Sequence, residues 1–318
     1  SGPGREGSGL GMKAVRKAFT ETLLSLAREN KNIWALATDS RGSVTLTDFA
    51  RELPEQFVEC GIAEQDAVGM AAGLTLEGIT SFVCGPASFY AARSAEQVKV
   101  DVAYCHRDVK VIGVSGGVSY GALGGTHHAV QDVALMRAIP DLEVFLPADA
   151  RQAEALTRYL AASGKPAYVR MGRGPVPEVY GEDCPFEAGK ANFLRRGKDA
   201  AVIACGEMVY PALEAARLLS GRGIEISVID MHTIKPLDEQ AILAAAETGL
   251  VITCEEHSII GGLGEAVAGV LSEKCPTMMR RIGVNDEFGH SGPAWEVLRQ
   301  FGLCADHIAE VARDFVKK

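Results

Sequence analysis

The sequence predicts an α/β protein made of two doubly wound domains with mostly parallel sheets. Short apolar runs alternate with longer amphipathic stretches along most of the chain, which is the pattern of βαβ units. A segment rich in proline and glycine, starting at Gly172, interrupts this alternation once and predicts a boundary between domains. The 318 residues are also enough for two domains that each bury a core.

Six apolar runs predict the strands of the first half, because they are short and rich in β-branched and aromatic residues. They begin at Ile33, Gln56, Thr80, Val109, Leu142 and Ala167. Between them apolar residues recur at helical spacing, which predicts helices over residues 15–29, 64–77, 91–104, 130–138 and 150–162. Strands that alternate with helices favour a parallel sheet covered on both faces.

The same alternation resumes after the proline- and glycine-rich segment. Strands are predicted from Asp199, Ile224, Leu250 and Arg280, and helices over residues 209–220, 238–247, 263–274, 294–301 and 305–316. We therefore expect a first domain over residues 12–180, a linker over 181–197 and a second domain over 198–318. Residues 1–11, which precede Met12, are interpreted as a vector-derived leader outside the fold.

Composition excludes several classes of protein. Hydrophobic residues make up 47% of the chain without long charged or repetitive tracts, which excludes disorder. The apolar runs are far shorter than the ~20 residues of a membrane span, and a net charge of −9 without a basic stripe argues against nucleic-acid binding. The eight cysteines form no CxxC motif and no secretory signal is visible, so we expect reduced thiols and a cytoplasmic location.

Glu64 is a candidate functional carboxyl group in the segment GIAEQ, which starts at Gly61 and includes Ile62. It stands where a predicted strand gives way to a helix. An acidic residue in a first helical turn often does no more than complement the helix dipole. The alternative is a partly buried carboxyl group with raised proton affinity that faces a ligand nitrogen.

A glycine-rich loop, GALGGTHH from Gly121, delivers His127 and His128 just before a helix. Adjacent histidines point in different directions and are poor joint metal ligands, so we assign no residue to a metal. Either histidine could be a buried, hydrogen-bonded imidazole. The functional alternative is a general acid or base in the crevice beyond the strand ends, with the glycines allowing close approach of a substrate.

Three residues at strand ends or helix starts are candidates for phosphate binding: Arg16, Ser43 and Arg173. Singly, such residues are most often solvated at the surface. If they converge, a pair of arginines with a hydroxyl group suits phosphate recognition.

Five motifs in order resemble the transketolase family: GIAEQ, the stretch from Phe89 to Arg93 with EQVK, GGTHHAVQDVALMR, DMHTIKPLD from Asp230, and EEHSIIGGLG from Glu255. The resemblance is to the C-terminal half of the family, a pyrimidine-binding domain followed by the transketolase C-terminal domain. It covers nearly all of the chain after Met12.

This resemblance implies thiamine diphosphate as cofactor and gives the candidates roles. Glu64 would share a proton with N1′ of the aminopyrimidine, with Ile62 beside it. Phe89 would stack on the pyrimidine, with Tyr90 as the alternative or additional contact. His127 would move protons at the hydroxyl groups of the substrate. Binding of the sugar phosphate would fall to Arg16, Ser43 and Arg173.

Two positions depart from the family pattern in ways that concern the substrate. Many transketolases carry an acid four residues before the loop histidine, where this chain has Leu123. A second substrate-contacting histidine is replaced by Ser115. Loss of buried polar recognition shifts specificity strongly, so we expect a phosphorylated branched or unusual ketose rather than the ordinary pentose phosphates.

The family's GDG motif, which grips the diphosphate and Mg²⁺, is absent from the chain. The resemblance therefore implies the small subunit of a split transketolase, inactive alone, whose larger partner subunit carries the diphosphate-binding domain and holds most of the Mg²⁺ site. The family implies an α2β2 heterotetramer or a dimer of the small subunit as the core of the assembly, and a homodimer is expected for this chain in isolation.

Three alternatives stay open at this point. The β subunit of a 2-oxo acid dehydrogenase has the same architecture, although the GGTHH loop and the arginines suit a sugar phosphate better. Deoxyxylulose-phosphate synthase shares GIAEQ but is normally one longer chain. A non-catalytic partner that kept the fold is the third, and the presence of Glu64 and His127 argues against it.

Overall fold

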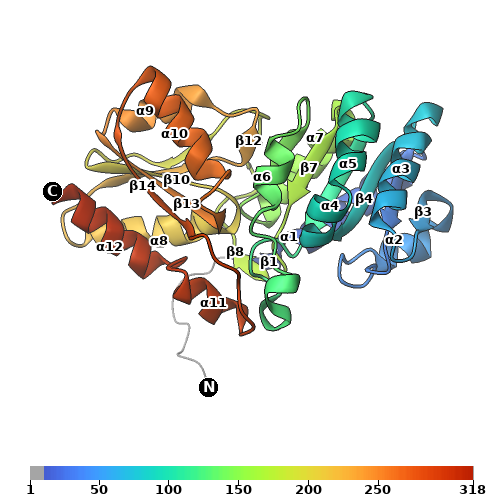
Figure 1. The fold of residues 1–318 in the computed structure, drawn as a ribbon, viewed down its shortest axis with the longest axis horizontal. Helices are drawn as coiled ribbons and strands as arrows, with labels where there is room; N and C mark the ends of the chain where they lie inside the picture. The colour runs from blue at the N-terminus through green and yellow to red at the C-terminus, as the bar shows by residue number, and fades with distance from the viewer. Residues whose placement is uncertain (1–10, 318) are drawn as a thin grey trace.

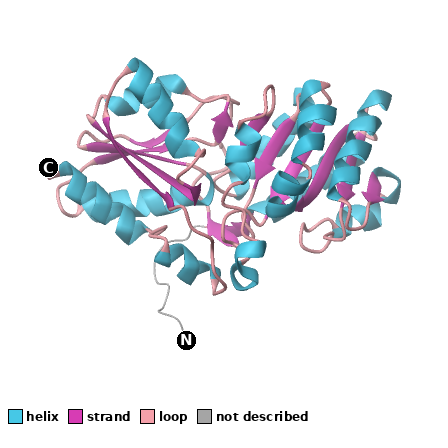
Figure 2. Ribbon diagram, viewed as in Figure 1, coloured by secondary structure: helices cyan, strands magenta, loops and turns pink. Residues whose placement is uncertain are grey.

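The computed structural model describes residues 11–317 and is built on two open sheets (Figures 1 and 2), with a separate antiparallel pair formed by β1 (Met12–Ala14) and β8 (Pro175–Pro177). The leader predicted over residues 1–11 lies outside the described residues, apart from Gly11. One sheet has seven strands and the other five, and we call the two parts the seven-stranded unit and the five-stranded unit. Most neighbouring strands are parallel, so the predicted fold class is confirmed.

The seven-stranded sheet is parallel except at one edge. Its order is β12 (Thr233–Lys235), β6 (Glu143–Phe145), β7 (Ala167–Arg170), β5 (Val109–Val114), β4 (Thr80–Pro86), β2 (Ile33–Ala37) and β3 (Phe57–Glu59), with β12 antiparallel to β6. One face is covered by α1 (Val15–Glu29) and α7 (Ala150–Ser163). The other is covered by α3 (Glu64–Leu74), α4 (Ala87–Arg93), α5 (Ala95–Gln97) and α6 (Asp132–Arg137).

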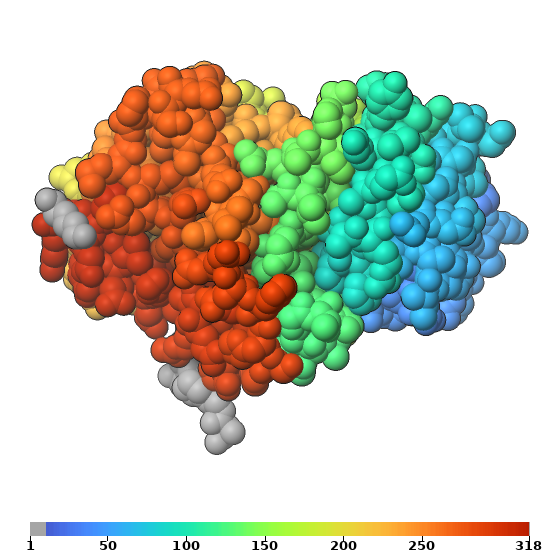
Figure 3. Space-filling view, in the orientation of Figure 1, coloured from blue at the N-terminus to red at the C-terminus, as the bar shows by residue number. Residues whose placement is uncertain are grey.

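The five-stranded sheet has the order β14 (Met278–Val284), β13 (Leu250–Ser258), β10 (Ala200–Ala204), β11 (Ile226–Asp230) and β9 (Asn192–Arg195). Helices α9 (Glu239–Ala246) and α10 (Leu263–Lys274) pack in one apolar cluster that continues into the seven-stranded unit. The opposite face carries α8 (Val209–Ser220) and α12 (Ala305–Val316), with α11 (Ala294–Gln300) beside them. The two units therefore share one hydrophobic core cluster, and Figure 3 shows them in close contact.

The elements that were not predicted are short, and contacts with other parts of the chain stabilise them. They are β1 (Met12–Ala14), β8 (Pro175–Pro177), β9, β12 and α2 (Thr47–Glu52). Strand β9 lies inside the predicted linker 181–197, and β12 lies beyond it yet joins the seven-stranded sheet. The helix predicted over 91–104 starts directly after Pro86 and is broken at Ser94, where the backbone leaves helical geometry. The division at 12–180, 181–197 and 198–318 stays a prediction.

A buried polar network joins the two units near the start of the predicted linker. The Asp230 carboxylate at the end of β11 accepts hydrogen bonds from the Tyr180 hydroxyl at 2.5 Å and from Gln152 Nε2 at 2.7 Å. Asp149 caps α7 and accepts hydrogen bonds from the backbone N–H groups of Val179 and Tyr180. Burial, above all, raises the pKa of Asp230 to about 7. This junction is therefore sensitive to pH near neutrality.

Asp230→Asn is expected to stabilise the chain more at pH 8 than at pH 5. Asp230 holds its proton more tightly in the folded chain than in the unfolded one, where the ordinary pKa of about 3.9 applies. Its stabilising contribution is therefore complete below about pH 4 and is lost as the pH rises to about 7. The free energy of unfolding of the variant, measured in urea, should gain about 2–3 kcal/mol on the wild type between pH 5 and pH 8.

The exposed Asp306→Asn serves as the matched control and should show no such pH-dependent difference. If the free energy of unfolding of Asp230→Asn differed from that of the wild type by the same amount at pH 5 and pH 8, Asp230 would be ionised in the folded chain as well as in the unfolded one.

Candidate functional site

Glu64 begins α3, directly after β3 and a turn at Gly61, and is almost fully buried with 3% of the residue exposed. Its Oε2 accepts a hydrogen bond of 2.9 Å from Arg93 Nη1 at the end of α4, and the Arg93 side chain is half exposed. Ile62, two residues before Glu64, is 76% exposed. The Glu64 carboxyl group is thus buried and held by Arg93, whereas the Ile62 side chain nearby is exposed to solvent.

Phe89 and Tyr90 are neighbours in α4, but they occupy different environments. Tyr90 is fully buried in the core and its hydroxyl group is hydrogen bonded to Thr38 Oγ1 at 3.2 Å. Phe89 is half-buried, with the Arg93 guanidinium 4.5 Å from the centre of its ring. Phe89 is therefore the ring that a ligand can reach.

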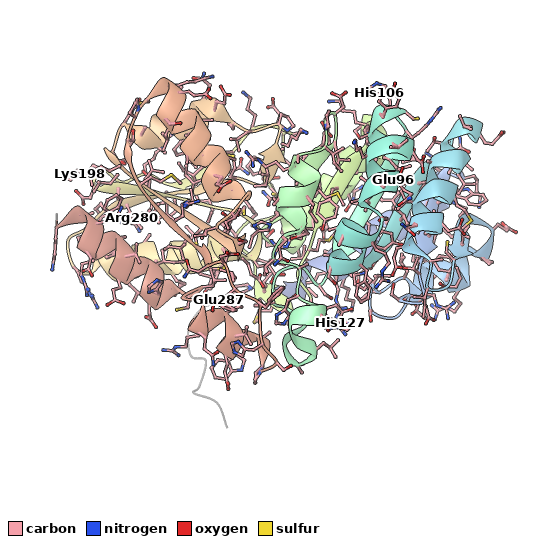
Figure 4. All side chains as sticks on the ribbon, in the orientation of Figure 1. Glu96, His106, His127, Lys198, Arg280 and Glu287 are labelled. Atoms are coloured by element: carbon pink, nitrogen blue, oxygen red, sulfur yellow. The ribbon has the colours of Figure 1, made fainter. Side chains whose placement is uncertain are left out.

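His127 lies in the glycine-rich loop after β5, at the carboxyl end of the parallel strands, whereas His106 before β5 lies at the opposite end (Figure 4). The His127 ring makes edge contacts with the rings of Phe89 and Tyr120, at 5.3 Å and 5.4 Å between ring centres. His128 is buried, with Nε2 3.3 Å from the Gly121 carbonyl oxygen, and burial lowers its pKa. Of the two histidines, His127 is the one placed to act on a ligand.

The loop glycines allow a close approach between the two units, and their predicted role toward a substrate stays a prediction. They let the loop backbone lie against the backbone of residues 289–294 in the five-stranded unit, which Figure 3 shows as green surface against red-orange surface. A Cβ atom at Gly121 would lie 2.8 Å from the Gly292 carbonyl oxygen, and one at Gly125 would lie 2.8 Å from that of Gly289. The close approach is therefore between the two units, and it fixes the loop that carries His127.

Arg16 and Arg173 lie close enough for the charge of one to affect the other, which is the condition set for a pair that binds phosphate. Arg16 in the first turn of α1 donates a hydrogen bond to the Ser43 carbonyl oxygen. Arg173, just after β7, donates one of 3.4 Å to Ser115 Oγ. Burial first, and then the positive charge of Arg173, lower the pKa of Arg16. Two cations held this close favour an anionic ligand.

Ser115 and Leu123, the two positions that depart from the family pattern, are placed differently. Ser115 is buried at the end of β5 with a positive φ of 58°, beside Arg173. Leu123 is 50% exposed in the turn of the glycine-rich loop.

Arg93 and Tyr120 complete an unbroken series of contacts across the site. Arg93 links the Glu64 carboxylate to the Phe89 ring, and Tyr120 links the His127 ring to the Arg173 guanidinium, which lies 5.0 Å from the Tyr120 ring centre. We call this series the contact strip: Glu64, Arg93, Phe89, His127, Tyr120 and Arg173. The signal for Arg93 was its place one helical turn after Phe89. The only sequence signal for Tyr120 was its position beside the glycine-rich loop.

A buried cluster of charges stands behind the arginine pair. Glu207 of the five-stranded unit lies over Gly172, in the space that a side chain would fill. Burial, and then the neighbouring Glu256 carboxylate, raise the pKa of Glu207 to about 8. Arg170 lies among these carboxyl groups, 3.6 Å from Asp132 and hydrogen bonded to the Glu256 carbonyl oxygen.

The described part of the chain, residues 11–317, contains no group of three or more His, Cys, Asp or Glu side chains that could hold a metal ion. None of the helices in that range is both long enough and apolar enough to cross a membrane.

Two family descriptions match successive parts of the chain. Residues 12–178 match "Transketolase, pyrimidine binding domain", and residues 189–308 match "Transketolase, C-terminal domain". These are the two domains, in the same order, that the motifs indicated.

Similar proteins extend over nearly the whole chain. A subunit of "Apulose-4-phosphate transketolase" from Phocaeicola vulgatus is 54% identical, over 96% of this chain and 99% of its own length. A "6-deoxy-6-sulfo-D-fructose transketolase" subunit of a Clostridium species is 37% identical, over 96% and 95%. Among solved structures, "Split gene transketolase, inactive beta4 tetramer" is 40% identical with a TM-score of 0.89, covering 96% of this chain and 98% of that one.

Proposed function

Because this chain belongs to the transketolase family, we propose that it is the small, β-type subunit of a split transketolase. The enzyme would move a two-carbon ketol unit from a ketose phosphate to an aldose phosphate with thiamine diphosphate as cofactor. The observation that carries this proposal is the contact strip, which joins a buried carboxyl group, a reachable aromatic ring, a histidine and Arg173, one arginine of the pair, in one continuous series of contacts.

The residues present fit the aminopyrimidine end of the cofactor. Glu64 offers a buried carboxyl group suited to a ring nitrogen, and Phe89 offers an aromatic face beside it. When bound, thiamine diphosphate supplies an electron sink for the two-carbon fragment. Glu64 would hold a proton at N1′ of the pyrimidine, with Ile62 as an apolar contact, and Phe89 would orient the ring. The fully buried Tyr90 supports this wall from the core.

The other half of the contact strip fits the substrate. His127 would take and return protons at the substrate hydroxyl groups as the donor C2–C3 bond breaks and the bond to the acceptor aldehyde carbon forms. Arg16 and Arg173 would bind the phosphate, with Ser43 holding Arg16 through its carbonyl group and Ser115 bonded to Arg173.

For the donor we propose apulose 4-phosphate, the substrate in the name of the relative that shares 54% of its residues over almost the full length. The two departures at Ser115 and Leu123 support an unusual donor, because a short hydroxyl and an apolar side chain stand where a histidine and an acid would recognise the ordinary pentose phosphates.

The larger partner subunit is part of the proposal. It would hold the cofactor diphosphate and most of the Mg²⁺ site, since the chain lacks a GDG motif. Two similar proteins, one named as a transketolase subunit and the other as a split gene transketolase, support a partner chain. A homodimer of the small subunit would form the core of the assembly. The 2-oxo acid dehydrogenase alternative has less support, because these similar proteins are transketolases.

Mixing this chain with its candidate large subunit, thiamine diphosphate and Mg²⁺ is expected to produce ketol transfer from apulose 4-phosphate. Neither chain alone should do so, because the cofactor site would lie between them. Calorimetry measures cofactor binding. With an aldose phosphate as acceptor, a coupled assay measures the three-carbon ketone phosphate that is released when the C2–C3 bond of this branched donor breaks. Stable association of the two chains without turnover of any ketose phosphate would instead support the non-catalytic partner.

A further inference from the structure

The glycine-rich loop places one aromatic side chain between the two ends of the substrate site. Tyr120 is half-buried, and its ring contacts the His127 ring at 5.4 Å with an interplanar angle of 75°. On its other side the Arg173 guanidinium lies 5.0 Å from the ring centre. Tyr120 also lies close enough to Arg16 to oppose slightly the lowering of its pKa, which burial and the charge of Arg173 cause. The Tyr120 ring therefore contacts both the His127 ring and the Arg173 guanidinium.

We propose that Tyr120 sets the length of sugar phosphate that the site accepts; with the donor proposed above, the accepted ketose is one whose phosphate is on C4. This inference rests on the proposed function, since it takes His127 as the residue that meets the reacting hydroxyl groups and the arginine pair as the phosphate site. The two contacts of Tyr120 place the His127 ring and the Arg173 guanidinium no more than about 10 Å apart.

Hydrogen bonds on both sides of Tyr120 hold the backbone of its loop, and the contacts with His127 and Arg173 hold its ring. At the base of the loop, the Val118 backbone N–H donates a hydrogen bond of 2.7 Å to the buried Glu256 carboxylate. After Tyr120, the Gly121 carbonyl oxygen accepts one of 3.4 Å from the Gly292 backbone N–H. Both anchors belong to the five-stranded unit, and neither depends on a bound ligand.

Chain length matters at this site because each added carbon moves the phosphate relative to the reacting carbonyl. One carbon–carbon bond is about 1.5 Å, and a misplacement of about 1 Å in a reacting geometry can cost 10²-fold in rate. A rigid ring between the histidine and Arg173 leaves little freedom to absorb such a step. Leu123, which cannot accept a hydrogen bond, offers no polar contact to offset it.

The test compares ketose phosphates that carry the phosphate on C4 and on C5, with the unbranched pair erythrulose 4-phosphate and xylulose 5-phosphate as probes, so that only the chain length differs. Each probe is measured as a donor for the assembled enzyme and as a ligand by calorimetry. The wild type should favour the 4-phosphate at least tenfold in kcat/KM and in affinity. Tyr120→Leu should reduce this preference at least tenfold, mainly by improving KM for the 5-phosphate.

Two variants separate the role of the ring from a loss of folding. Tyr120→Phe keeps the ring and should keep the preference for the 4-phosphate. Tyr104→Leu, at an exposed tyrosine outside the loop, should change neither probe. An unchanged preference in Tyr120→Leu would overturn the inference. Absence of turnover with a calorimetric preference that still shifts in Tyr120→Leu would refute the proposed reaction and uphold the role of Tyr120.

Discussion

Glu64→Gln is expected to lower kcat for ketol transfer by roughly 10²–10⁴-fold in the assembled enzyme. Glutamine keeps the size of the side chain and can still accept a hydrogen bond from Arg93, but it cannot hold the proton that the pyrimidine nitrogen needs. The residue is almost fully buried, so water cannot replace the lost carboxyl group. Steady-state kinetics at saturating cofactor measures the effect on kcat.

The matched control is Glu77→Gln, an exposed glutamate just beyond the end of α3, which should leave kcat unchanged. Cofactor affinity, measured by calorimetry, should fall in Glu64→Gln as well, while the thermal melting temperature of the free chain should stay close to that of the wild type. Full activity in Glu64→Gln would remove this carboxyl group from the mechanism.

Arg170→Met is expected to destabilise the folded chain by about 3–5 kcal/mol. The Arg170 guanidinium is buried among carboxyl groups, 3.6 Å from Asp132 and beside Glu207 and Glu256. Methionine fills much of the space but removes the positive charge, so the buried carboxyl groups are left uncompensated. Because burial raises the pKa of Glu207 to about 8 and also raises that of Glu256, more of this negative charge is present at high pH. Urea unfolding should show a larger loss at pH 9 than at pH 6.

Arg217→Met provides the comparison, since Arg217 is an exposed arginine on α8 whose carboxylate partner Glu214 lies one turn away on the same helix. Its urea midpoint should match that of the wild type at both pH values. If the urea midpoint of Arg170→Met also matched that of the wild type at both pH values, the buried carboxyl groups would be neutral in the folded chain and would need no cation.

Much of the fold could be predicted because the long elements carry their own signals. Helices α1, α8, α10 and α12 begin and end where the apolar periodicity does. The short strand β12 could not be found in this way, because three residues carry no period. It exists because residues 233–235 pair with β6 across the junction between the units. Strand β9 lay inside a segment whose prolines and glycines predicted a linker.

The candidate site was predictable where a motif placed a chemical group at a strand end. Glu64, His127, Arg16 and Arg173 became candidates because they stand at strand ends or helix starts, and the resemblance gave them roles that stay predictions. Tyr120 and Glu207 were not candidates, because their contacts are with residues far away in the chain. The packing of residues 289–294 against the loop glycines could not be predicted for the same reason.

The seating of the glycine-rich loop on residues 289–294 also constrains how this chain can change during evolution. The five-stranded unit supplies none of the contact strip, yet its backbone holds the loop that carries His127 and Tyr120. A gene that lost this unit would keep every residue of the contact strip and would lose the support that aligns them. Substitutions near residue 290 are therefore expected to shift the loop that carries His127 and Tyr120, although that segment supplies no residue of the contact strip.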